Sequence, residues 1–442
     1  MLSQQENELL VRTGPGTPGG EMMRSYWQPV ALAADFPPDC APAPVRILGE
    51  DLVLWRDEQG RIGLMGRQCP HRGADLSFGR IEDGGLRCLY HGWLFDIQGR
   101  CLDMPAESPA IAAKYKTEVH HAAFPCVERG GLIFAYLGKG KPPVFPKYEF
   151  LEADDEHRFV SMVRMDCNYL QGLEGEVDPA HLSYLHRPIA KKDTRSVPGS
   201  DKSADQFYKE QVNPELSAER TDFGLRIYSV RGADAQRQYL RITNFIMPNK
   251  AAIVGDVGRI GEGYSVFFHV PIDDVAHWRV EITHNRVRPL DKTKYIAELE
   301  TELLPDRSKV RNLSNRYLQD RAAMKTDNFN GMGDSFLVHD SFATESQGPI
   351  FDRSREFLGS SDKCIVAARR LLLDAIADVR EQRDPLHVIR DEKLADVNNI
   401  VVVSEVIPKS VDIRQAWKER PPYSTAGADA KADAPTPAVN GV

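Results

Sequence analysis

The order of hydrophobic and polar residues divides the chain into a β-rich first part and a mixed second part. In the first part, short apolar and β-branched runs alternate with turn residues such as Gly49-Glu50-Asp51, which is typical of strands. These runs are 45–48, 52–55, 62–65 and 132–137. The Gly/Pro-rich stretch 138–143 that follows has the composition of a linker. We therefore predict an all-β domain over 41–145, preceded by a segment, 1–40, that packs on the second domain, 146–420.

The second part combines strand and helix patterns. Four runs alternate as strands do when one face of an antiparallel sheet is buried. They are 224–230, 239–246, 264–270 and 277–283, and two helical stretches follow at 292–304 and 362–383. The later helical stretch carries an apolar stripe whose simplest role is core packing. The pattern predicts an α+β domain over 146–420, and the Pro/Ala/Asp-rich residues 421–442 are predicted to be disordered.

Composition is that of a globular protein and excludes several functions. The chain has 442 residues, of which 42% are hydrophobic, enough for two or three packed domains. No run approaches the roughly 18 apolar residues of a membrane span, and the start, MLSQQENELL, lacks the features of a signal peptide. The seven cysteines are scattered and odd in number, which favours a reducing compartment. A net charge of -8 without a basic patch argues against nucleic-acid binding, so we expect a cytoplasmic protein with no membrane or nucleic-acid partner.

The stretch 69–91 offers four metal ligands in two matched pairs: Cys69 with His71, and Cys88 with His91. Two thiolates and two imidazoles could hold zinc tetrahedrally. The same quartet is the ligand set of a Rieske [2Fe-2S] cluster, with two cysteines on one iron and two histidines on the other. Glycines that follow both pairs suit a backbone wrapped around something larger than one ion. We therefore predict a Rieske cluster, with zinc as the alternative.

Several motifs resemble those of one enzyme family. C-P-H-R-G-A and C-x-Y-H-G-W-x-F-D resemble the Rieske loops of ring-hydroxylating oxygenases, and D-x2-H-x4-H resembles their mononuclear-iron motif. Two further segments resemble the phthalate 4,5-dioxygenase group: 345–353, E-S-x-G-P-I-x-D-R, and 361–373, S-D-K-x-I-x2-A-R-R-x-L-L. The resemblance extends from about residue 7 to 373. The resemblance implies an α+β chain in which an all-β Rieske domain precedes a catalytic domain of the helix-grip type, an antiparallel sheet with covering helices.

The second candidate metal site lies in the segment from Asp178 to His186. On an ideal helix, histidines five residues apart diverge by about 140°, so His181 and His186 converge only where the helix is irregular or begins. Without the resemblance, Asp178 as a helix cap beside structural histidines explains the segment equally well. The resemblance implies that His181 and His186 bind Fe(II) together with a carboxylate, for which Asp340 is the candidate. The other candidates near it are Asp334, Glu345 and His339, which stands where the group has a glutamine.

The resemblance also implies partners. Asp178 matches an aspartate that links a metal-bound histidine to a cluster histidine, here His91, of the neighbouring chain in a head-to-tail ring. A homotrimer, or a hexamer of stacked trimers, follows. The sequence holds no G-x-G-x-x-G after a strand and no C-x4-C-x2-C set. NAD(P)H and flavin chemistry is therefore expected on a separate reductase carrying flavin and a [2Fe-2S] centre.

The implied function is that of an oxygenase component that hydroxylates an aromatic carboxylic acid with O2, the acid being phthalate-like or a substituted benzoate. The alternatives are monooxygenation or O-demethylation of a methoxy- or phenoxybenzoate, and a pure electron carrier. A carboxylate substrate needs a cation in a mostly apolar pocket. Arg231 and Arg241 are the candidates because they lie on or beside predicted strands; a solvated salt bridge is the alternative role for each.

Overall fold

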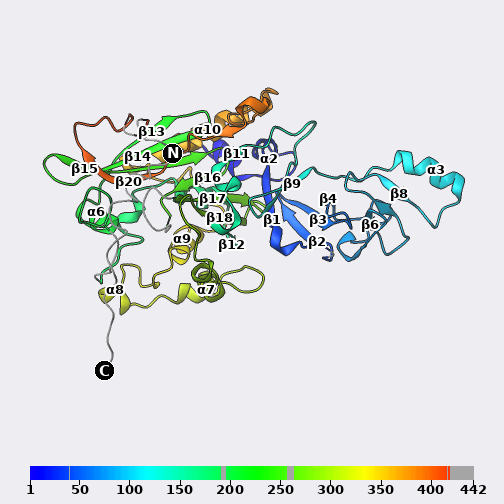
Figure 1. Cartoon of the computed structure of the whole chain (residues 1–442), viewed down its shortest axis with the longest axis horizontal. Helices are drawn as coiled ribbons and strands as arrows, with labels where there is room; N and C mark the ends of the chain where they lie inside the picture. The colour runs from blue at the N-terminus through cyan, green and yellow to red at the C-terminus, as the bar shows by residue number, and fades with distance from the viewer. Residues whose placement is uncertain (39, 191–195, 256–262, 416, 419–442) are drawn as a thin grey trace.

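The computed structural model describes residues 1–38, 40–190, 196–255, 263–415 and 417–418. Within these ranges the chain forms two parts that follow one another along the long axis of the molecule (Figure 1). The first part is mainly β and the second is α+β, which confirms the predicted fold class. The predicted disordered tail, 421–442, lies outside the described residues. Among the helices of the described part, none is long and apolar enough to cross a membrane.

The first part consists of three small antiparallel sheets. The strands predicted near 45, 52, 62 and 132 are all present, extended or shortened by a few residues. One sheet has the order β2 (Ala43–Ile47), β3 (Glu50–Arg56), β4 (Ile62–Gly66). The second has the order β5 (Arg80–Glu82), β6 (Gly85–Arg87), β7 (Leu94–Phe95), β8 (Cys101–Asp103). The third has the order β1 (Gln28–Leu32), β10 (Leu132–Ala135), β9 (Cys126–Arg129). Helix α3 (Pro109–Glu118) projects beyond them (Figure 1). The segment 1–40 thus contributes β1 to the first part, because β1 pairs with β10.

The second part is organised around a long antiparallel sheet. Its order is β12 (Arg158–Met165), β18 (His277–Asn285), β17 (Gly263–Pro271), β16 (Lys250–Ile253), β15 (Arg237–Ile246), β14 (Gly224–Gly232), β13 (Glu215–Arg220), and β20 (Val403–Pro408) also pairs with β15. The four predicted strands correspond to β14, β15, β17 and β18. Many of their residues are buried on both faces, because helices and loops cover the sheet. Two adjacent short strands, β11 (Lys147–Tyr148) and β19 (Asp396–Val397), pair in parallel.

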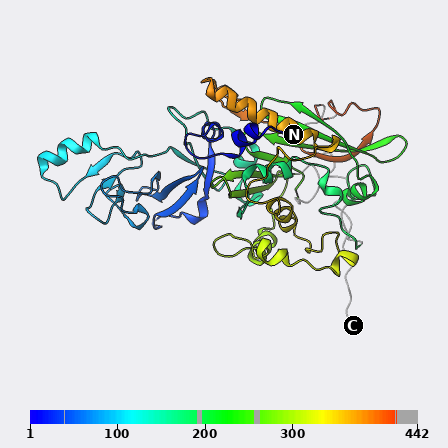
Figure 2. The ribbon, with the colours of Figure 1, turned by 180° about the vertical axis from the view of Figure 1, so that it is seen from behind.

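Helices cover this sheet and bind the N-terminus to it. The predicted helix near the C-terminus is α10 (Lys363–Arg380), and its apolar stripe is buried as expected. It packs on β13 and β14 and also on α1 (Gln4–Val11) and α2 (Pro18–Arg24), which lie beneath the long orange helix in Figure 2. The side-chain amide of Asn168 donates to the carbonyl of Val11, and Tyr169 Oη donates to that of Leu10. The remaining α-helices are α4 (Glu149–Glu152), α5 (Tyr169–Glu176), α6 (Ala204–Glu210), α7 (Lys292–Glu302), α8 (Ala323–Thr326) and α9 (Phe336–Glu345).

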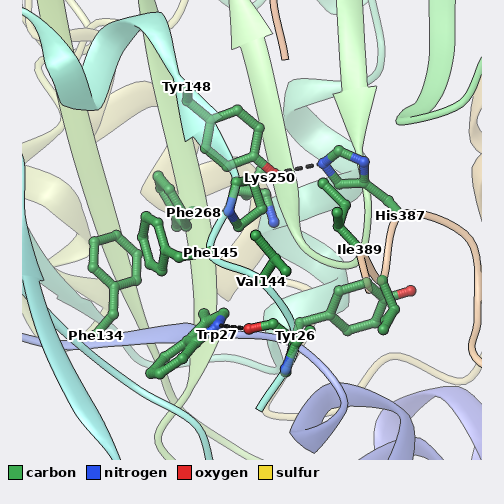
Figure 3. A pocket seen from close by; sticks show the side chains of 13 residues that line it. Tyr26, Trp27, Phe134, Val144, Phe145, Tyr148, Lys250, Phe268, His387 and Ile389 are labelled. Carbon is green, nitrogen blue, oxygen red and sulfur yellow. Dashed lines mark hydrogen bonds between the residues drawn. The ribbon is translucent and has the colours of Figure 1, made fainter. Parts of the chain in front are cut away.

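The junction between the two parts is packed with aromatic rings (Figure 3). Trp27 lies 5.7 Å from Phe145 between ring centroids, and its indole donates to the carbonyl of Pro143. The rings surround a cavity of about 20 Å³, which has room for about one water molecule. This junction therefore holds the two parts together and is too small for an organic substrate.

One charged side chain lies in this apolar junction. Lys250 is 4% exposed, and its Nζ donates to the carbonyl of Met247 and lies 5.5 Å from the ring of Phe268. Burial lowers the pKa of Lys250 to about 7. Nearby, Tyr148 Oη and His387 Nε2 are 2.6 Å apart (Figure 3).

Candidate metal centres and substrate cavity

The first candidate centre is built by two loops of matching geometry at one end of the β-rich part. In each loop the cysteine carbonyl accepts a hydrogen bond from a glycine amide four residues later, Gly73 for Cys69 and Gly92 for Cys88. Both glycines have positive φ values, +72° and +77°, which side chains rarely adopt, and a Cβ on Gly92 would lie 2.6 Å from Pro105. The glycines seen in the sequence are thus required by the way each loop turns back on itself.

The four predicted cluster ligands come together in these loops. Cys69 and Cys88 are each only 3% exposed, whereas the rings of His71 and His91 reach the surface with centroids 4.4 Å apart. The ring of His71 stacks on Trp93 with centroids 4.6 Å apart. The arrangement has a buried sulfur side and an exposed imidazole side, as expected for a cluster that passes electrons through its histidine-bound iron.

The electrostatics of the Cys69 thiol support a metal-bound state. Burial, followed by the proximity of Cys88, raises the pKa of Cys69 to about 12. The protein alone therefore keeps this thiol neutral, and a positively charged metal is needed to hold two thiolates in so dry a place. The donor set and its burial fit a [2Fe-2S] cluster.

The second candidate centre joins two distant segments of the α+β part. One potential ligand atom from each of His181, His186 and Asp340 lies within 4.8 Å of the other two. Helix α5 ends at Glu176, His181 begins a short 3₁₀ turn, and Tyr184 leaves helical geometry with φ -129° and ψ -55°. The two histidines therefore approach each other outside any regular helix, with ring centroids 5.1 Å apart. Because the segment is not a regular helix, the five-residue spacing does not prevent the two side chains from sharing one metal ion.

The geometry of the trio suits a divalent metal. Nε2 of His186 lies 3.0 Å from Oδ1 of Asp340. Two ligand atoms that each lie about 2.1 Å from one ion, at a right angle, are about 3 Å apart. Burial alone would raise the pKa of Asp340, but His186 and then His181 lower it below its usual value, so the carboxylate is ionised. The trio thus offers two imidazoles and one charged oxygen, a ligand set that suits non-haem Fe(II).

Asp178 lies beside this trio without belonging to it. Its Oδ1 accepts a hydrogen bond from the amide of Ala180 and so caps that amide in a short turn. The structural alternative expected a helix to begin at Asp178, but the 3₁₀ turn that follows has Ala180 at its N-cap. Its Oδ2 lies 3.7 Å from Nδ1 of His181, and that buried nitrogen has no hydrogen-bond partner among the described residues. Burial lowers the pKa of His181, but Asp178 and other nearby carboxylates outweigh it and leave the pKa raised. Asp178 therefore combines capping with an electrostatic contact to a candidate ligand.

The other residues considered as ligands occupy different positions. Glu345 is buried in an ion pair with Lys309 at 2.6 Å and accepts a hydrogen bond from Tyr317 Oη at 2.6 Å. Asp334 is exposed at the mouth of a cavity. Nδ1 of His339 lies 3.1 Å from Nδ1 of His186, and its Nε2 lies 2.9 Å from the carbonyl of Gly333. Burial, followed by the charge on His186, lowers the pKa of His339 to about 4.

Two cavities meet at this centre. The larger, of about 880 Å³, is lined by His181, His186 and Asp340 and by residues of the sheet. The smaller, of about 470 Å³, reaches His181 and Asp340 from another side and is bordered by Phe357, which is 96% exposed. Asp178 lines both. The larger cavity is within the range of small-molecule sites, and it places a ligand next to the candidate metal position.

The two candidate substrate arginines have different surroundings. Arg241 lines the larger cavity, is 8% exposed and donates from a terminal nitrogen to Tyr208 Oη at 2.7 Å. Its Nε is buried without a hydrogen-bond partner, and no carboxylate of the described residues pairs with it. Arg231 does not line this cavity and bonds to the carbonyl of Pro179 and the hydroxyl of Ser183. Arg231 therefore supports the loop that carries His181, and of the two candidates only Arg241 lines the cavity of the candidate metal centre.

Sequence reasoning did not find the charged groups that separate the two cavities. Arg279 and Glu176 line both, with Arg279 Nε 3.4 Å from Glu176 Oε1 and another nitrogen 3.3 Å from Glu281. Burial raises the pKa of Glu176 to about 7 despite the nearby guanidinium. Arg279 lies on β18, and strand alternation alone does not show which of its polar residues face a cavity.

Comparison with known families decides the class of protein. The family model described as LigXa C-terminal domain like matches residues 135–431, and the Rieske [2Fe-2S] domain model matches residues 26–124. The chain belongs to the Rieske non-haem iron oxygenases. It is thus an oxidoreductase with a Rieske cluster and a mononuclear iron, and the zinc and pure-electron-carrier alternatives fall away.

Full-length relatives agree with this Rieske oxygenase assignment. The chain is 37% identical to the phthalate 4,5-dioxygenase oxygenase subunit of Pseudomonas putida over 85% of this chain and 87% of the relative. It is 33% identical to the 5,5'-dehydrodivanillate O-demethylase oxygenase subunit of Sphingobium sp. over 88% and 84%. Among solved structures, the oxygenase and ferredoxin complex of carbazole 1,9a-dioxygenase has a TM-score of 0.55 at 18% identity, covering 88% of this chain and 95% of that one, which shows a shared fold.

Proposed function

We propose that this oxygenase subunit hydroxylates an aromatic carboxylic acid, phthalate-like or a substituted benzoate, whose carboxylate binds Arg241. The observation that carries the proposal is a buried guanidinium in the cavity of the metal centre with no carboxylate partner among the described residues. An unpaired buried charge is costly, and a bound carboxylate would relieve that cost with charge-assisted hydrogen bonds. The named substrate of the phthalate relative is an aromatic dicarboxylate, which agrees with this chemistry.

In this proposal each metal has its own residues. Cys69, His71, Cys88 and His91 hold the cluster; His181, His186 and Asp340 hold the mononuclear iron. When bound, the cluster supplies single electrons and the iron supplies open positions for O2. The chain's own groups orient the substrate, and the buried cavity around Arg241 limits the access of water to the reacting ring.

The substrate proposal is tested by separating charge recognition from catalysis. Arg241→Met keeps much of the side chain's apolar volume and removes the guanidinium. It should raise the KM for a responding benzoate by about 10- to 100-fold, because a charge-assisted hydrogen bond contributes roughly 1.5–3 kcal/mol. In the wild type the uncharged methyl ester should have a higher KM than the acid, and in Arg241→Met the two KM values should be similar. Arg226→Gln, a buried arginine of β14 outside both cavities, is the matched control. An unchanged KM in Arg241→Met would contradict the proposal.

O-demethylation of a methoxy- or phenoxybenzoate is the second candidate. The O-demethylase relative and the hydroxyl-rich wall of the larger cavity favour it. On that wall Ser265 Oγ and Thr283 Oγ1 lie 2.8 Å apart, and Thr243 and Ser404 line other parts of the same cavity. Hydroxyls suit a substrate that carries further oxygen substituents. A panel of phthalates, chlorobenzoates, phenoxybenzoates and methoxybenzoates distinguishes the two, since ring dihydroxylation yields a cis-diol and demethylation yields formaldehyde.

We also propose a head-to-tail homotrimer, with a hexamer of stacked trimers as a variant. Support comes from the placement of the two sites in different parts of the chain: the cluster loops flank β5 and β6 in the first part, and α9, which carries Asp340, belongs to the second part (Figure 1). The cluster loops expose Leu89 and Tyr90, and the smaller cavity with exposed Phe357 offers a docking place for such a tip beside Asp178. A neighbour's His91 would then approach Asp178.

Electrons would come from a separate NAD(P)H-dependent reductase with flavin and a [2Fe-2S] centre. The chain lacks the corresponding nucleotide and ferredoxin motifs, and the carbazole dioxygenase oxygenase is known in complex with a ferredoxin. A cytoplasmic location belongs to the same proposal, and the seven free cysteines are consistent with a reducing compartment.

A further inference from the structure

The residue just before Asp340 contacts the candidate ligand His186 rather than the metal position. We propose that His339 is a positioning residue that fixes the tautomer and the ring orientation of His186 for metal binding. The inference rests on the ligand assignment proposed above, and it assigns a role to a side chain that lies outside the group of three candidate ligands.

The hydrogen bonds of His339 define which nitrogen carries a proton. Its Nε2 lies 2.9 Å from the carbonyl of Gly333, and a carbonyl oxygen only accepts, so Nε2 donates. In the neutral ring Nδ1 is then an acceptor. It faces Nδ1 of His186 at 3.1 Å, and this contact is a hydrogen bond only if His186 Nδ1 donates. The chain from Gly333 through His339 therefore assigns a proton to Nδ1 of His186.

This assignment leaves the correct nitrogen for a metal. Nε2 of His186 lies 3.0 Å from Asp340 Oδ1 and donates to this carboxylate in the metal-free chain; a bound ion would take the place of that proton and leave the proton on Nδ1. A metal-bound imidazole almost always donates its other N–H to a fixed acceptor, which sets the ring orientation and increases the basicity of the ligand nitrogen. A second imidazole performs that task here.

The ring of His186 also contacts two aromatic rings. Phe336 stacks against it with centroids 4.3 Å apart and planes 24° apart, and His339 lies nearly parallel with centroids 5.3 Å apart. Phe336 and His339 both belong to α9, the helix that carries Asp340. One helix therefore supplies a candidate ligand and the two groups that hold a second ligand in place.

His339 is excluded as a competing ligand by the same geometry. Both of its ring nitrogens are engaged, one with Gly333 and one with His186. It is 3% exposed and does not line the larger cavity. Binding a metal through His339 would break the contact that orients His186.

Two variants of equal shape isolate the hydrogen bonds. Glutamine can donate to Gly333 and accept from His186, whereas methionine has similar length and fills the space without a donor. The probe is Co(II), added to protein whose mononuclear iron is removed while the Rieske spectrum is retained. Bound cobalt is measured at free concentrations set by a chelator. We expect Co(II) affinity about 10- to 100-fold weaker in His339→Met and largely retained in His339→Gln.

Two control variants distinguish the positioning role of His339 from the metal-ligand assignment on which it rests. Val338→Ala weakens the packing of α9 but keeps the hydrogen bonds, so it should lower the melting temperature without changing Co(II) affinity. His186→Ala should abolish binding, and normal binding there would overturn the ligand assignment itself. Wild-type Co(II) affinity in a folded His339→Met protein would overturn the positioning role. If His339→Met is not recovered folded, His339→Gln binding more weakly than Val338→Ala overturns it.

Discussion

Oδ2 of Asp178 lies 3.7 Å from Nδ1 of His181, and the carboxylate borders both cavities that meet at the candidate iron site. The other oxygen caps the turn at Ala180. The two oxygens therefore have separate tasks, since one stabilises the local backbone and the other acts on the imidazole electrostatically. A side chain in this position can contact His181 and a group that enters through the smaller cavity at the same time.

Replacing Asp178 separates these tasks. Asp178→Asn should retain both metals, because asparagine caps about as well as aspartate and neither metal loses a ligand. Without the charge that supports the imidazole, turnover should fall by roughly 10- to 100-fold. The defect should appear as slow oxidation of the reduced cluster in a rapid-mixing single turnover with substrate and O2. A wild-type oxidation rate in iron-loaded trimeric protein would leave Asp178 with the capping role only.

The buried amine of Lys250 predicts a pH-dependent stability. Its folded pKa of about 7 lies below the unfolded value of 10.5, so the unfolded chain takes up a proton first as the pH falls. Wild-type stability should therefore decrease from about pH 10 to pH 7, by at most about 1.4 kcal/mol per pH unit. Lys250→Met should remove this pH dependence of stability. The variant should have a higher melting temperature than the wild type, and the difference should be larger at pH 7 than at pH 9.5.

Lys309 provides the contrast to Lys250. It is as deeply buried but lies 2.6 Å from Glu345, so Lys309→Met leaves an uncompensated carboxylate and should be destabilised by about 3–5 kcal/mol. Thermal unfolding at both pH values measures both variants. If the melting temperatures of Lys250→Met and the wild type differed by the same amount at pH 7 and pH 9.5, Lys250 would not be the group whose protonation changes the stability.

The exposed ring of Phe357 predicts an interface. Phe357 is 96% exposed in the single chain, and Phe357→Asp replaces its apolar ring with a charge. This substitution should dissociate a trimer into monomers. Sedimentation velocity measures the mass, and an unchanged Rieske spectrum shows that the chain remains folded. Leu394→Asp, at a 68% exposed position outside both cavities, should leave the mass unchanged. Phe357→Asp protein with the wild-type mass would move the interface elsewhere.

Sequence periodicity predicted the sheet better than it predicted the site. Strands such as β15 and β18 were predicted because apolar and polar residues alternate along them, whereas α9 was not predicted. That helix, FLVHDSFATE, mixes apolar residues with His339, Asp340 and three further polar residues in no helical stripe, so no amphipathic pattern reveals it. Helices in the core that carry functional groups are hard to recognise for this reason.

The candidate arginines show what only a folded chain reveals. Arg231 on β14 and Arg241 on β15 are both buried, and only the resemblance to phthalate-type relatives, not the residue pattern, favours Arg241 for the cavity. The sheet register pairs Arg241 with Ser229 and Arg231 with Tyr239. The neighbouring loops then engage Arg231 with Pro179 and leave Arg241 facing the cavity. Convergence of His181 and His186 likewise depends on a break in helix geometry that spacing alone does not predict.

The central claim is that His181, His186 and Asp340 hold an iron distinct from the Rieske cluster, and Asp340→Ala tests it most directly. Iron and acid-labile sulfide are quantified in anaerobically purified protein together with the electron paramagnetic resonance signal of the reduced cluster. We predict loss of one iron of three per chain, an unchanged Rieske signal and no substrate-dependent O2 uptake. Three irons per chain with full O2 uptake in Asp340→Ala would contradict the account.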